Sequence, residues 1–313
     1  MKKIILTGVD GNLGSVAASQ LMKLTKKENL IFCGYSTEIL DTYTKQGIET
    51  RQTDFNTLDG LADKFNNGEV LALISMPFVG KKRQQAHKNV IDAAKEAGVK
   101  KIIYTSLVNA ADLNNPSIEK IDHAFTEEYI KKSGLDYIFL RNSQYAEAMI
   151  TNYFTFVHQG SNLQNNQGDG KMAYISRKDC AKAVAYALLA DDLHHKVLNI
   201  NGKQLMTISD FIEIGNKETG NHVKYQFISD EENYAIFDTM GVPRTTEGKF
   251  KKDSEAPFSS EGMVTFGKAI RENKMANFTK DFEYLTGDKP ISVQDMFENS
   301  QNFQIGQRHS LDK

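Results

Sequence analysis

The first half of the chain alternates short, mostly apolar runs rich in β-branched residues with segments in which apolar residues recur every three or four positions. The short runs predict strands that are buried on both faces, and the longer segments predict helices that cover them. This alternation is typical of a parallel sheet with crossover helices. The predicted strands are Lys3–Thr7, Leu30–Gly34, Glu49–Thr53, Leu71–Ser75, Lys101–Thr105 and Tyr137–Leu140.

Helical spacing separates these runs. Apolar residues form one stripe between Val16 and Leu24, a second between Val90 and Ala97, and a third between Ile118 and Tyr129. Gly98 and Gly134 stand where the second and third helices should end, because glycine is favoured just past a helix C-terminus.

The pattern changes after about residue 150. The polar segment Ser161–Gly170 predicts an exposed loop, and Pro243–Pro257 predicts a mobile one. Tyr174–Ser176 predicts a strand, followed by a helix with Asp179 in its first turn. The remaining predictions are a strand at Val197–Ile200, helices at Ser209–Thr219, Gly262–Asn273 and Ser292–Asn299, and a fraying polar end up to Lys313.

Composition excludes several classes of protein. The 313 residues are 40% hydrophobic and 25% charged, which is ordinary for a folded globular chain. The 38 basic and 40 acidic residues are mixed along the chain, so it lacks the basic face of a nucleic-acid binder. Cys33 and Cys180 form no disulfide framework or CxxC pair, and no apolar stretch is long enough for a signal peptide or membrane span. We therefore expect a cytoplasmic protein with no nucleic-acid or membrane partner.

Glycines cluster directly after the first predicted strand, in the segment Thr7-Gly8-Val9-Asp10-Gly11-Asn12-Leu13-Gly14. Gly8 allows a tight exit from the strand, Gly11 lets the backbone approach a pyrophosphate, and Gly14 permits close packing of the helix. The helix start then offers free N–H groups to phosphates. The segment predicts a dinucleotide site whose contacts come from Thr7, Gly8, Gly11, Asn12, Leu13 and Gly14.

These patterns together predict an α/β fold with a Rossmann-type, doubly wound parallel sheet. We assign residues 1–150 to an NAD(P)-binding domain, to which residues 171–202 return. Residues 151–313 form a smaller C-terminal α/β region that we expect to bind the substrate.

The end of the second strand bears on which nucleotide binds. An NAD site usually carries an acid there, which holds the ribose 2′-hydroxyl. Here the strand is followed by Tyr35 and Ser36, with neither an acid nor an arginine in place. We expect both residues to contact the cofactor, and the lack of a carboxylate favours NADP(H) over NAD(H).

Several sequence blocks carry a family likeness across nearly the whole chain. They are the glycine loop, Thr53–Phe55, Asn89–Gly98, Lys101–Leu107, Ser133–Asn142 and Lys171–Ala183, with a weaker match in Phe278–Phe297. With these blocks the chain resembles the NmrA-like branch of the atypical short-chain dehydrogenases/reductases, and within it the type 2 NAD(P)H:quinone oxidoreductases.

The resemblance implies roles for residues at the strand ends. Asp54 and Phe55 would lie beside the adenine, and Thr105 and Ser106 would lie next to the nicotinamide ribose. Ser75, Met76 and Pro77 would contact the cofactor, while Phe78, Asn142 and Gln144 would wall the substrate pocket. An alternative for Phe55 and Phe78 is that both are plain core residues, because aromatic residues at strand ends commonly pack inward.

Ordinary short-chain dehydrogenases carry a tyrosine with a lysine four residues later, so that the lysine can lower the pKa of the phenol. Among the 12 tyrosines only Tyr174 and Lys178 have this spacing, and their predicted elements put them on different faces. Where NmrA-like proteins often have a lysine, this chain has His123, which could donate to the ribose or move a proton near neutral pH. Lys120 is a weaker substitute. His123 and Tyr145 are the candidate catalytic residues, and a partly exposed histidine without catalytic duty is the alternative for His123.

Other chemistries lack their signatures. His194 and His195 belong to no HExxH or Cys/His metal spacing, and neither a GxSxG elbow nor a phosphate-binding GxxxxGK[ST] loop occurs. Two functions follow from the pattern. The leading one is an NAD(P)H-dependent oxidoreductase that passes hydride to a small electrophile, such as a quinone, enone or carbonyl compound. The alternative is a non-catalytic, NmrA-type redox sensor that binds NAD(P) and signals to a protein partner. The substrate, and whether the chain is a homodimer, are left open.

Overall fold

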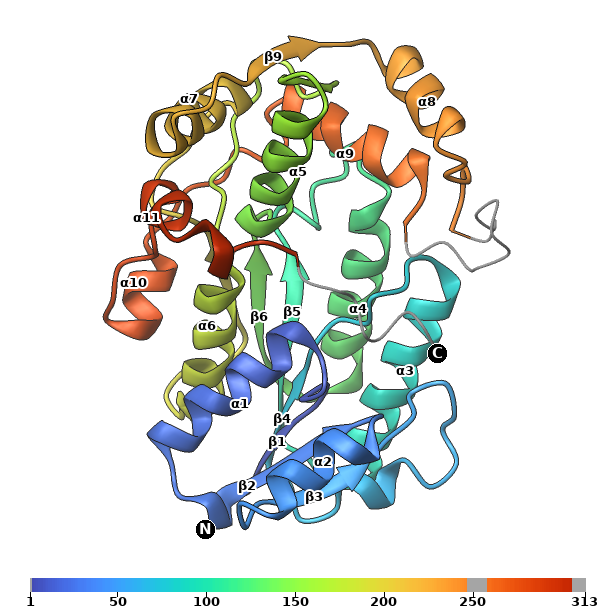
Figure 1. Cartoon of the computed structure of the whole chain (residues 1–313). Helices are drawn as coiled ribbons and strands as arrows, with labels where there is room; N and C mark the ends of the chain where they lie inside the picture. The colour runs from blue at the N-terminus through green and yellow to red at the C-terminus, as the bar shows by residue number, and fades with distance from the viewer. Residues whose placement is uncertain (1, 247–257, 306–313) are drawn as a thin grey trace.

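A seven-stranded parallel sheet forms the centre of the molecule (Figure 1). The computed structural model describes residues 2–246 and 258–305. The strands are β1 (Ile4–Leu6), β2 (Leu30–Gly34), β3 (Glu49–Gln52), β4 (Val70–Leu73), β5 (Lys101–Leu107), β6 (Asp136–Asn142) and β8 (Lys196–Ile200), in the order β3-β2-β1-β4-β5-β6-β8. All neighbouring pairs run parallel, so the predicted doubly wound sheet is confirmed. The order reverses between β1 and β4, the point where such sheets bind ligands.

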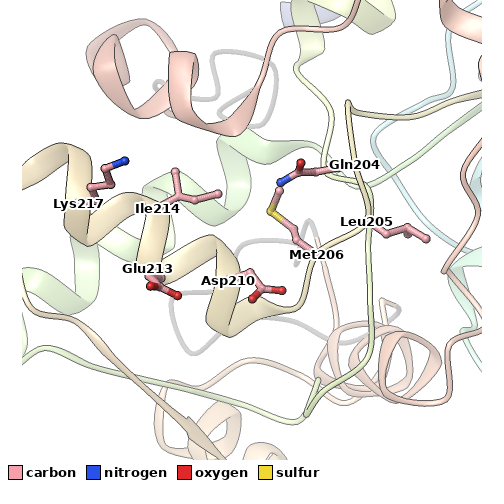
Figure 2. A pocket seen from close by; sticks show the side chains of 7 residues that line it. All are labelled: Gln204, Leu205, Met206, Asp210, Glu213, Ile214 and Lys217. Atoms are coloured by element: carbon pink, nitrogen blue, oxygen red, sulfur yellow. The ribbon is translucent and has the colours of Figure 1, made fainter.

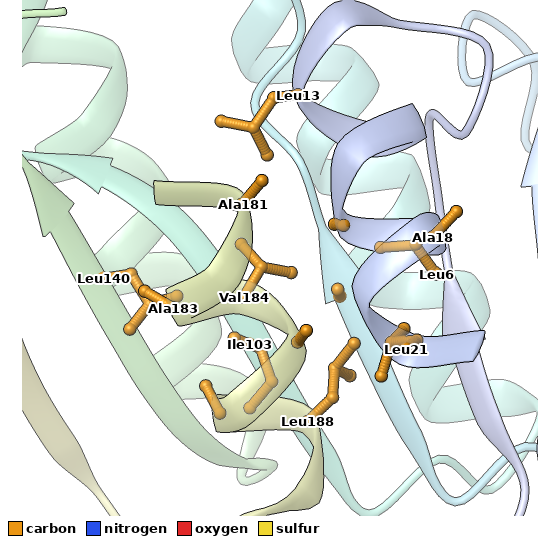
Figure 3. Packing of buried hydrophobic residues seen from close by; sticks show 14 of the residues in the cluster. Leu6, Leu13, Ala18, Leu21, Ile103, Leu140, Ala181, Ala183, Val184 and Leu188 are labelled. Carbon is orange, nitrogen blue, oxygen red and sulfur yellow. The ribbon is translucent and has the colours of Figure 1, made fainter. Parts of the chain in front are cut away.

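Helices cover both faces of this sheet. The first face carries α1 (Asn12–Leu24), α2 (Thr37–Thr44) and α6 (Arg177–Leu189), and the second carries α3 (Lys81–Glu96), α4 (Glu119–Ser133) and the 3-10 turn η2 (Ala62–Phe65). On the first face α1 packs directly against α6 (Figure 3). Ala18 and Leu21 of α1 and Ala181 and Leu188 of α6 belong to one buried cluster in this layer. Burial of this apolar surface holds α1, and therefore the glycine loop, in place.

A second set of elements lies beyond the carboxyl ends of the central strands (Figure 1). It comprises α5 (Ala146–His158), β7 (Asn162–Asn165), α7 (Ile208–Thr219), β9 (Lys224–Phe227), α8 (Asp230–Thr239), α9 (Ser260–Arg271) and α11 (Val293–Glu298). Helix α10 (Asp281–Thr286) instead packs against α6 and β8, where Phe282 belongs to the core on the α1 side of the sheet. Strands β7 and β9 pair in parallel as a separate small sheet. Asn109, after β5, donates to the carbonyl of Lys274 at 2.6 Å, which fastens this region to the strand ends.

Two predictions for the second half are wrong. Ser161–Gly170 is not an exposed loop, because it contains β7 and because Leu163 and Asn166 are buried. Leu163 packs in the C-terminal core, and the Asn166 amide donates to Asp230 and to the carbonyl of Val264. Tyr174–Ser176 is not a strand. It makes only an isolated bridge between Ile175 and Tyr145, and Ser176 already caps α6.

The helices predicted near α7, α9 and α11 are present with shifts of one or two residues at their ends. Helix α8 was not predicted, although Ser229 and Glu232 form a capping box at its start. Of the predicted mobile loop Pro243–Pro257, residues 247–257 lie outside the described residues, as do 306–313 of the predicted fraying end. In the described ranges, no helix combines the length and apolar character that crossing a bilayer requires.

The packing of α1 against α6 can be tested with two leucines of α1, one that takes part in the contact and one that serves as the control. Leu21 is fully buried in this contact, whereas Leu24, one turn later, is 40% exposed. Leu21→Ala should lower the free energy of unfolding by about 2–5 kcal/mol, through lost burial and the cavity left behind. Leu24→Ala should change it by no more than about 0.5 kcal/mol. Urea denaturation of both variants measures the difference, and equal losses would contradict the packing described.

Candidate cofactor and substrate site

The glycine loop turns sharply between β1 and α1. Gly8 has a positive φ of 66°, and its carbonyl accepts a hydrogen bond from the Gly11 N–H at 2.9 Å. A Cβ placed on Gly14 would lie 1.9 Å from that same carbonyl oxygen, so only glycine fits there. The close approach that Gly14 permits is thus between the helix and the loop itself.

The start of α1 has no internal partner for its first N–H groups. Gly11 occupies the cap position, no side chain accepts from the first turn, and that turn contains no acidic residue. Asn12, the first helical residue, is exposed. Unsatisfied N–H groups and the positive end of the helix dipole favour a bound anion. These features fit the linked phosphates of a dinucleotide, and contacts with the backbone of Gly11, Asn12 and Leu13 stay a prediction.

Side-chain hydroxyls tie the strand ends together next to this loop. Thr7 Oγ1 donates to the carbonyl of Ala72 at 2.8 Å, and Thr105 Oγ1 accepts from the Ser75 N–H at 2.8 Å. The predicted residues Thr7, Ser75 and Thr105 therefore gather at one edge, from β1, β4 and β5. Their hydroxyl and amide contacts fix the backbone on which a ligand at the switch point would rest.

The segment after β4 is held by a buried histidine that sequence analysis missed. His87, on α3, accepts from the Met76 N–H through Nε2 at 3.0 Å, and its Nδ1 pairs with Thr126 Oγ1 at 2.9 Å. Because Nε2 accepts, the proton of the neutral ring is on Nδ1. Burial, helped by the positive charge of Arg83, lowers the pKa of His87 to about 3. Met76 is thus positioned by a histidine that stays neutral at pH 7.

His123 lies on α4, and its Nδ1 is 2.9 Å from the hydroxyl of Tyr104 on β5. Burial lowers the pKa of His123 well below the ordinary value, and the charge of Arg83 adds to this effect. Burial also raises the pKa of the fully buried Tyr104 hydroxyl. The pair is neutral near pH 7, so these surroundings do not favour proton transfer by His123. A hydrogen-bonding role for His123 toward the cofactor stays a prediction.

The hydroxyl of Ser106 makes a buried hydrogen bond within the protein. Its Oγ donates to Oε1 of Glu127 at 2.6 Å, and Glu127 is only 1% exposed. Arg141, on β6, donates to both oxygens of the same carboxylate, at 2.9 and 2.6 Å. The bidentate ion pair between Arg141 and Glu127, together with the Ser106 hydrogen bond, fixes the ends of β5 and β6 relative to α4. Sequence analysis missed both Glu127 and Arg141.

The end of β6 presents polar atoms without protein partners. Oδ1 of Asn142, Oγ of Ser143 and Oε1 of Gln144 are buried and unpaired among the residues that the structure describes. Buried polar groups normally have a partner, so such a row indicates a place for a polar ligand. The Tyr145 hydroxyl accepts from Asn142 Nδ2 at 3.2 Å, and burial raises the pKa of Tyr145. Asn142 and Tyr145 are therefore in contact, and a substrate-pocket wall formed by Asn142 and Gln144 stays a prediction.

At the end of β2 the structure supplies an acid that the strand itself lacks. Asp10, from the glycine loop, accepts with Oδ2 from the N–H groups of Tyr35 and Ser36, both at 2.8 Å. The side chain of Tyr35 is 62% exposed. Our premise that no carboxylate lies at this edge is therefore wrong. The signal was the aspartate directly before the second glycine of the loop.

The aromatic residues predicted at the strand ends differ in burial. Phe55 is 7% exposed and belongs to the core on the α3 side of the sheet, which agrees with the alternative weighed for it. Asp54 is partly exposed and accepts from the Asn56 backbone at 2.9 Å. Phe78 is half-buried, with the Lys82 ammonium 4.3 Å from its ring centre, and Pro77 is exposed. Contacts of these residues with adenine or substrate stay predictions.

Other candidate groups are not assembled into a site. Tyr174 is buried and its hydroxyl donates to Gln167, whereas Lys178 lies over the ring of Phe303. This tyrosine and lysine therefore do not form a catalytic pair. In residues 2–246 and 258–305, no three His, Cys, Asp or Glu side chains are arranged to hold a metal ion.

An open cavity of about 300 Å³ lies beside α7 (Figure 2). Its lining residues are Gln204, Leu205, Met206, Asp210, Glu213, Ile214 and Lys217. None of the predicted cofactor or substrate residues is among them. The cavity is separate from the glycine loop and the ends of β4, β5 and β6.

Fold and site together define a dinucleotide-binding protein of the doubly wound α/β class. The sequence model of the NmrA-like family matches residues 1–258, and the chain belongs to this family. It is 32% identical over 267 residues to quinone oxidoreductase 2 of Escherichia coli (strain K12), covering 85% of this chain and 92% of the relative. The likeness inferred from sequence is therefore confirmed.

Solved structures agree with this assignment. An NADPH-dependent quinone oxidoreductase, QOR2, from Escherichia coli, complexed with NADPH, superposes with a TM-score of 0.84 at 27% identity, covering 96% of this chain and 100% of that chain. A triphenylmethane reductase of Citrobacter sp., complexed with NADP(H), superposes with a TM-score of 0.81 at 25% identity, covering 95% and 99%.

The His87 contact predicts a pH-dependent stability. In the unfolded chain His87 takes up a proton as the pH falls past about 6.5, whereas the folded chain resists protonation down to about 3. The stabilisation by neutral His87 is therefore complete above pH 6.5 and is lost between pH 6.5 and 3. His87→Phe should cost about 1–3 kcal/mol at pH 7, because the Met76 N–H loses its acceptor. Below pH 6.5 the gap to wild type should shrink by about 1.4 kcal/mol per pH unit.

Urea denaturation between pH 7 and pH 5 measures this gap. His222 is exposed, so His222→Phe serves as the control and should leave a pH-independent difference near zero. A constant gap for His87→Phe over the same range would refute a buried, neutral His87.

Proposed function

We propose that this chain is an NADP(H)-dependent oxidoreductase that passes hydride to a small electrophile, with quinones as the first class to test. The observation that carries the proposal is the glycine loop, where Gly14 packs against the Gly8 carbonyl and the start of α1 has no side-chain cap, which suits it to bind phosphates. Relatives of the chain support the proposal, since the solved structures of QOR2 and of the triphenylmethane reductase are complexes with NADPH and with NADP(H). A cytoplasmic location and a homodimer stay predictions.

When bound, the reduced nicotinamide supplies the hydride, and the acceptor takes up one proton as it is reduced. The chain has to bind, orient and exclude water. The ends of β4 and β5 carry Ser75, Met76 and Thr105, which would position the nicotinamide end of the cofactor. Their backbone is fixed by the Thr105 and His87 contacts.

The contact of the Tyr145 hydroxyl with Asn142 supports a role for Tyr145 toward the acceptor oxygen. Because its hydroxyl oxygen accepts from Asn142, its own proton is free to be donated elsewhere. Burial raises its pKa, so the phenol is protonated at neutral pH. We assign to Tyr145 a hydrogen bond to the oxygen that gains charge as hydride arrives.

Turnover and binding together test the proposed function. Purified protein is mixed with NADPH and with a panel of quinones, enones and aldehydes, and the absorbance of the reduced nicotinamide is followed. NADPH binding is titrated in parallel by calorimetry. We expect acceptor-dependent oxidation. Gly14→Ala should weaken NADPH binding at least about tenfold, because the loop must move to admit the Cβ.

Ser19, exposed on the same helix, supplies the control Ser19→Ala, which should bind like wild type. Tight NADPH binding without oxidation by any acceptor would favour the redox-sensor alternative. Absence of binding would refute both functions.

Removal of the Tyr145 hydroxyl should separate catalysis from binding. Tyr145→Phe should lower kcat about 100-fold with carbonyl acceptors and less with quinones, whose reduced oxygens need little help from a proton donor. NADPH affinity should be unchanged. Tyr284→Phe is the control, because Tyr284 is 66% exposed on α10. Equal loss with both acceptor classes, or a loss confined to NADPH binding, would contradict the role of Tyr145.

A further inference from the structure

The carboxylate of Asp10 occupies the position from which Rossmann-type sites distinguish the two nicotinamide cofactors. With the pyrophosphate on the start of α1, the adenosine ribose of a bound dinucleotide lies at the end of β2. Asp10 closes off that end, because its Oδ2 holds both the Tyr35 and the Ser36 N–H groups at 2.8 Å. With both N–H groups donating to Asp10, neither is available to a 2′-phosphate at this edge.

The carboxylate is held firmly. A Cβ on Gly34, the last residue of β2, would lie 3.0 Å from Asp10 Oδ1, so the acid packs directly against the strand end. Two N–H donors fix its orientation, and its charge contributes to the raised pKa of Tyr43 on α2, after burial. Oδ1 then remains as an acceptor for a ribose hydroxyl.

Acidic residues flank this edge, and Arg51, the basic residue of β3 opposite Cys33, is paired with Glu49. Glu38 lies in the first turn of α2, and Asp54 follows β3, the strand beside β2. The segments 34–38 and 53–56 contain no lysine or arginine. A 2′-phosphate would therefore meet negative charge without a cation from either segment, whereas a 2′-hydroxyl could donate to a carboxylate.

We propose that Asp10 weakens the preference of this chain for NADPH over NADH, by holding the Tyr35 and Ser36 N–H groups at the end of β2 and placing a negative charge beside the ribose 2′ position. This inference rests on the proposed NADP(H)-dependent function and deepens it. The chain takes NADPH, but Asp10 narrows the preference for NADPH over NADH. Replacing Asp10 by a neutral residue should therefore strengthen NADPH binding relative to NADH binding.

Calorimetric titration of Asp10→Asn tests the inference without turnover. Asparagine keeps an acceptor oxygen for the Tyr35 and Ser36 N–H groups but removes the charge. We expect the Kd for NADPH to fall about tenfold, while the Kd for NADH stays within about twofold or rises. The fragments 2′,5′-ADP, which carries the 2′-phosphate, and 5′-AMP, which lacks it, should behave alike: the Kd for 2′,5′-ADP should fall, while the Kd for 5′-AMP stays within about twofold or rises. The gain should shrink at high salt, because screening weakens the charge.

Glu28→Gln supplies the matched control, since Glu28 is exposed before the opposite end of β2 and its loss changes the net charge equally. It should leave the NADPH to NADH ratio of Kd values unchanged. Thermal unfolding of each apoprotein establishes that it is folded, and Asp10→Ser, also neutral, serves as a second variant. If a folded, neutral Asp10 variant has the same ratio of NADPH to NADH Kd values as wild type, this inference is overturned and the proposed function is not. If wild type binds neither nucleotide, the proposed function fails and this inference fails with it.

Discussion

The contact between the Gly8 carbonyl and the start of α1 is the constraint on which the nucleotide-binding edge depends. A side chain at position 14 would lie 1.9 Å from that oxygen, so helix and loop can meet only through bare backbone. The contact fixes where the helix N-terminus points, and it directs Asp10 toward β2. One backbone approach therefore fixes both the helix start that is offered to phosphates and the place of the Asp10 carboxylate at the end of β2.

Local signals were sufficient for much of the fold. Strands buried on both faces appear as unbroken apolar runs, and β2 has the predicted ends, Leu30 and Gly34. The glycine loop was recognisable because each glycine has a task that depends on neighbours in sequence. Strand ends were less predictable. β5 and β6 each continue to residues, Leu107 and Asn142, whose pairing partners come from the neighbouring strand.

The site residues that sequence missed act through partners far along the chain. Asp10 meets Tyr35, His87 meets Met76 and Thr126, and Glu127 meets Arg141. No spacing rule reports such pairs, because they form only when the sheet brings the strand ends together. Polarity misled in the same way at Ser161–Gly170. Asn166 is buried because Asp230 and the Val264 carbonyl accept from it, and neither partner is visible locally.

The return of α6 and β8 to the sheet has a consequence for how the protein is made. The apolar face of α1 is covered by α6, which ends at Leu189, and β6 gains its outer neighbour only when β8 is complete at Ile200. A ribosome therefore releases the whole glycine loop long before the segment that buries its helix. Until then the growing chain exposes an apolar helix face and an unpaired strand edge, both of which attract chaperones or other nascent chains. The glycine loop is therefore synthesised well before α6 and β8, the elements that hold its helix and the sheet edge in place.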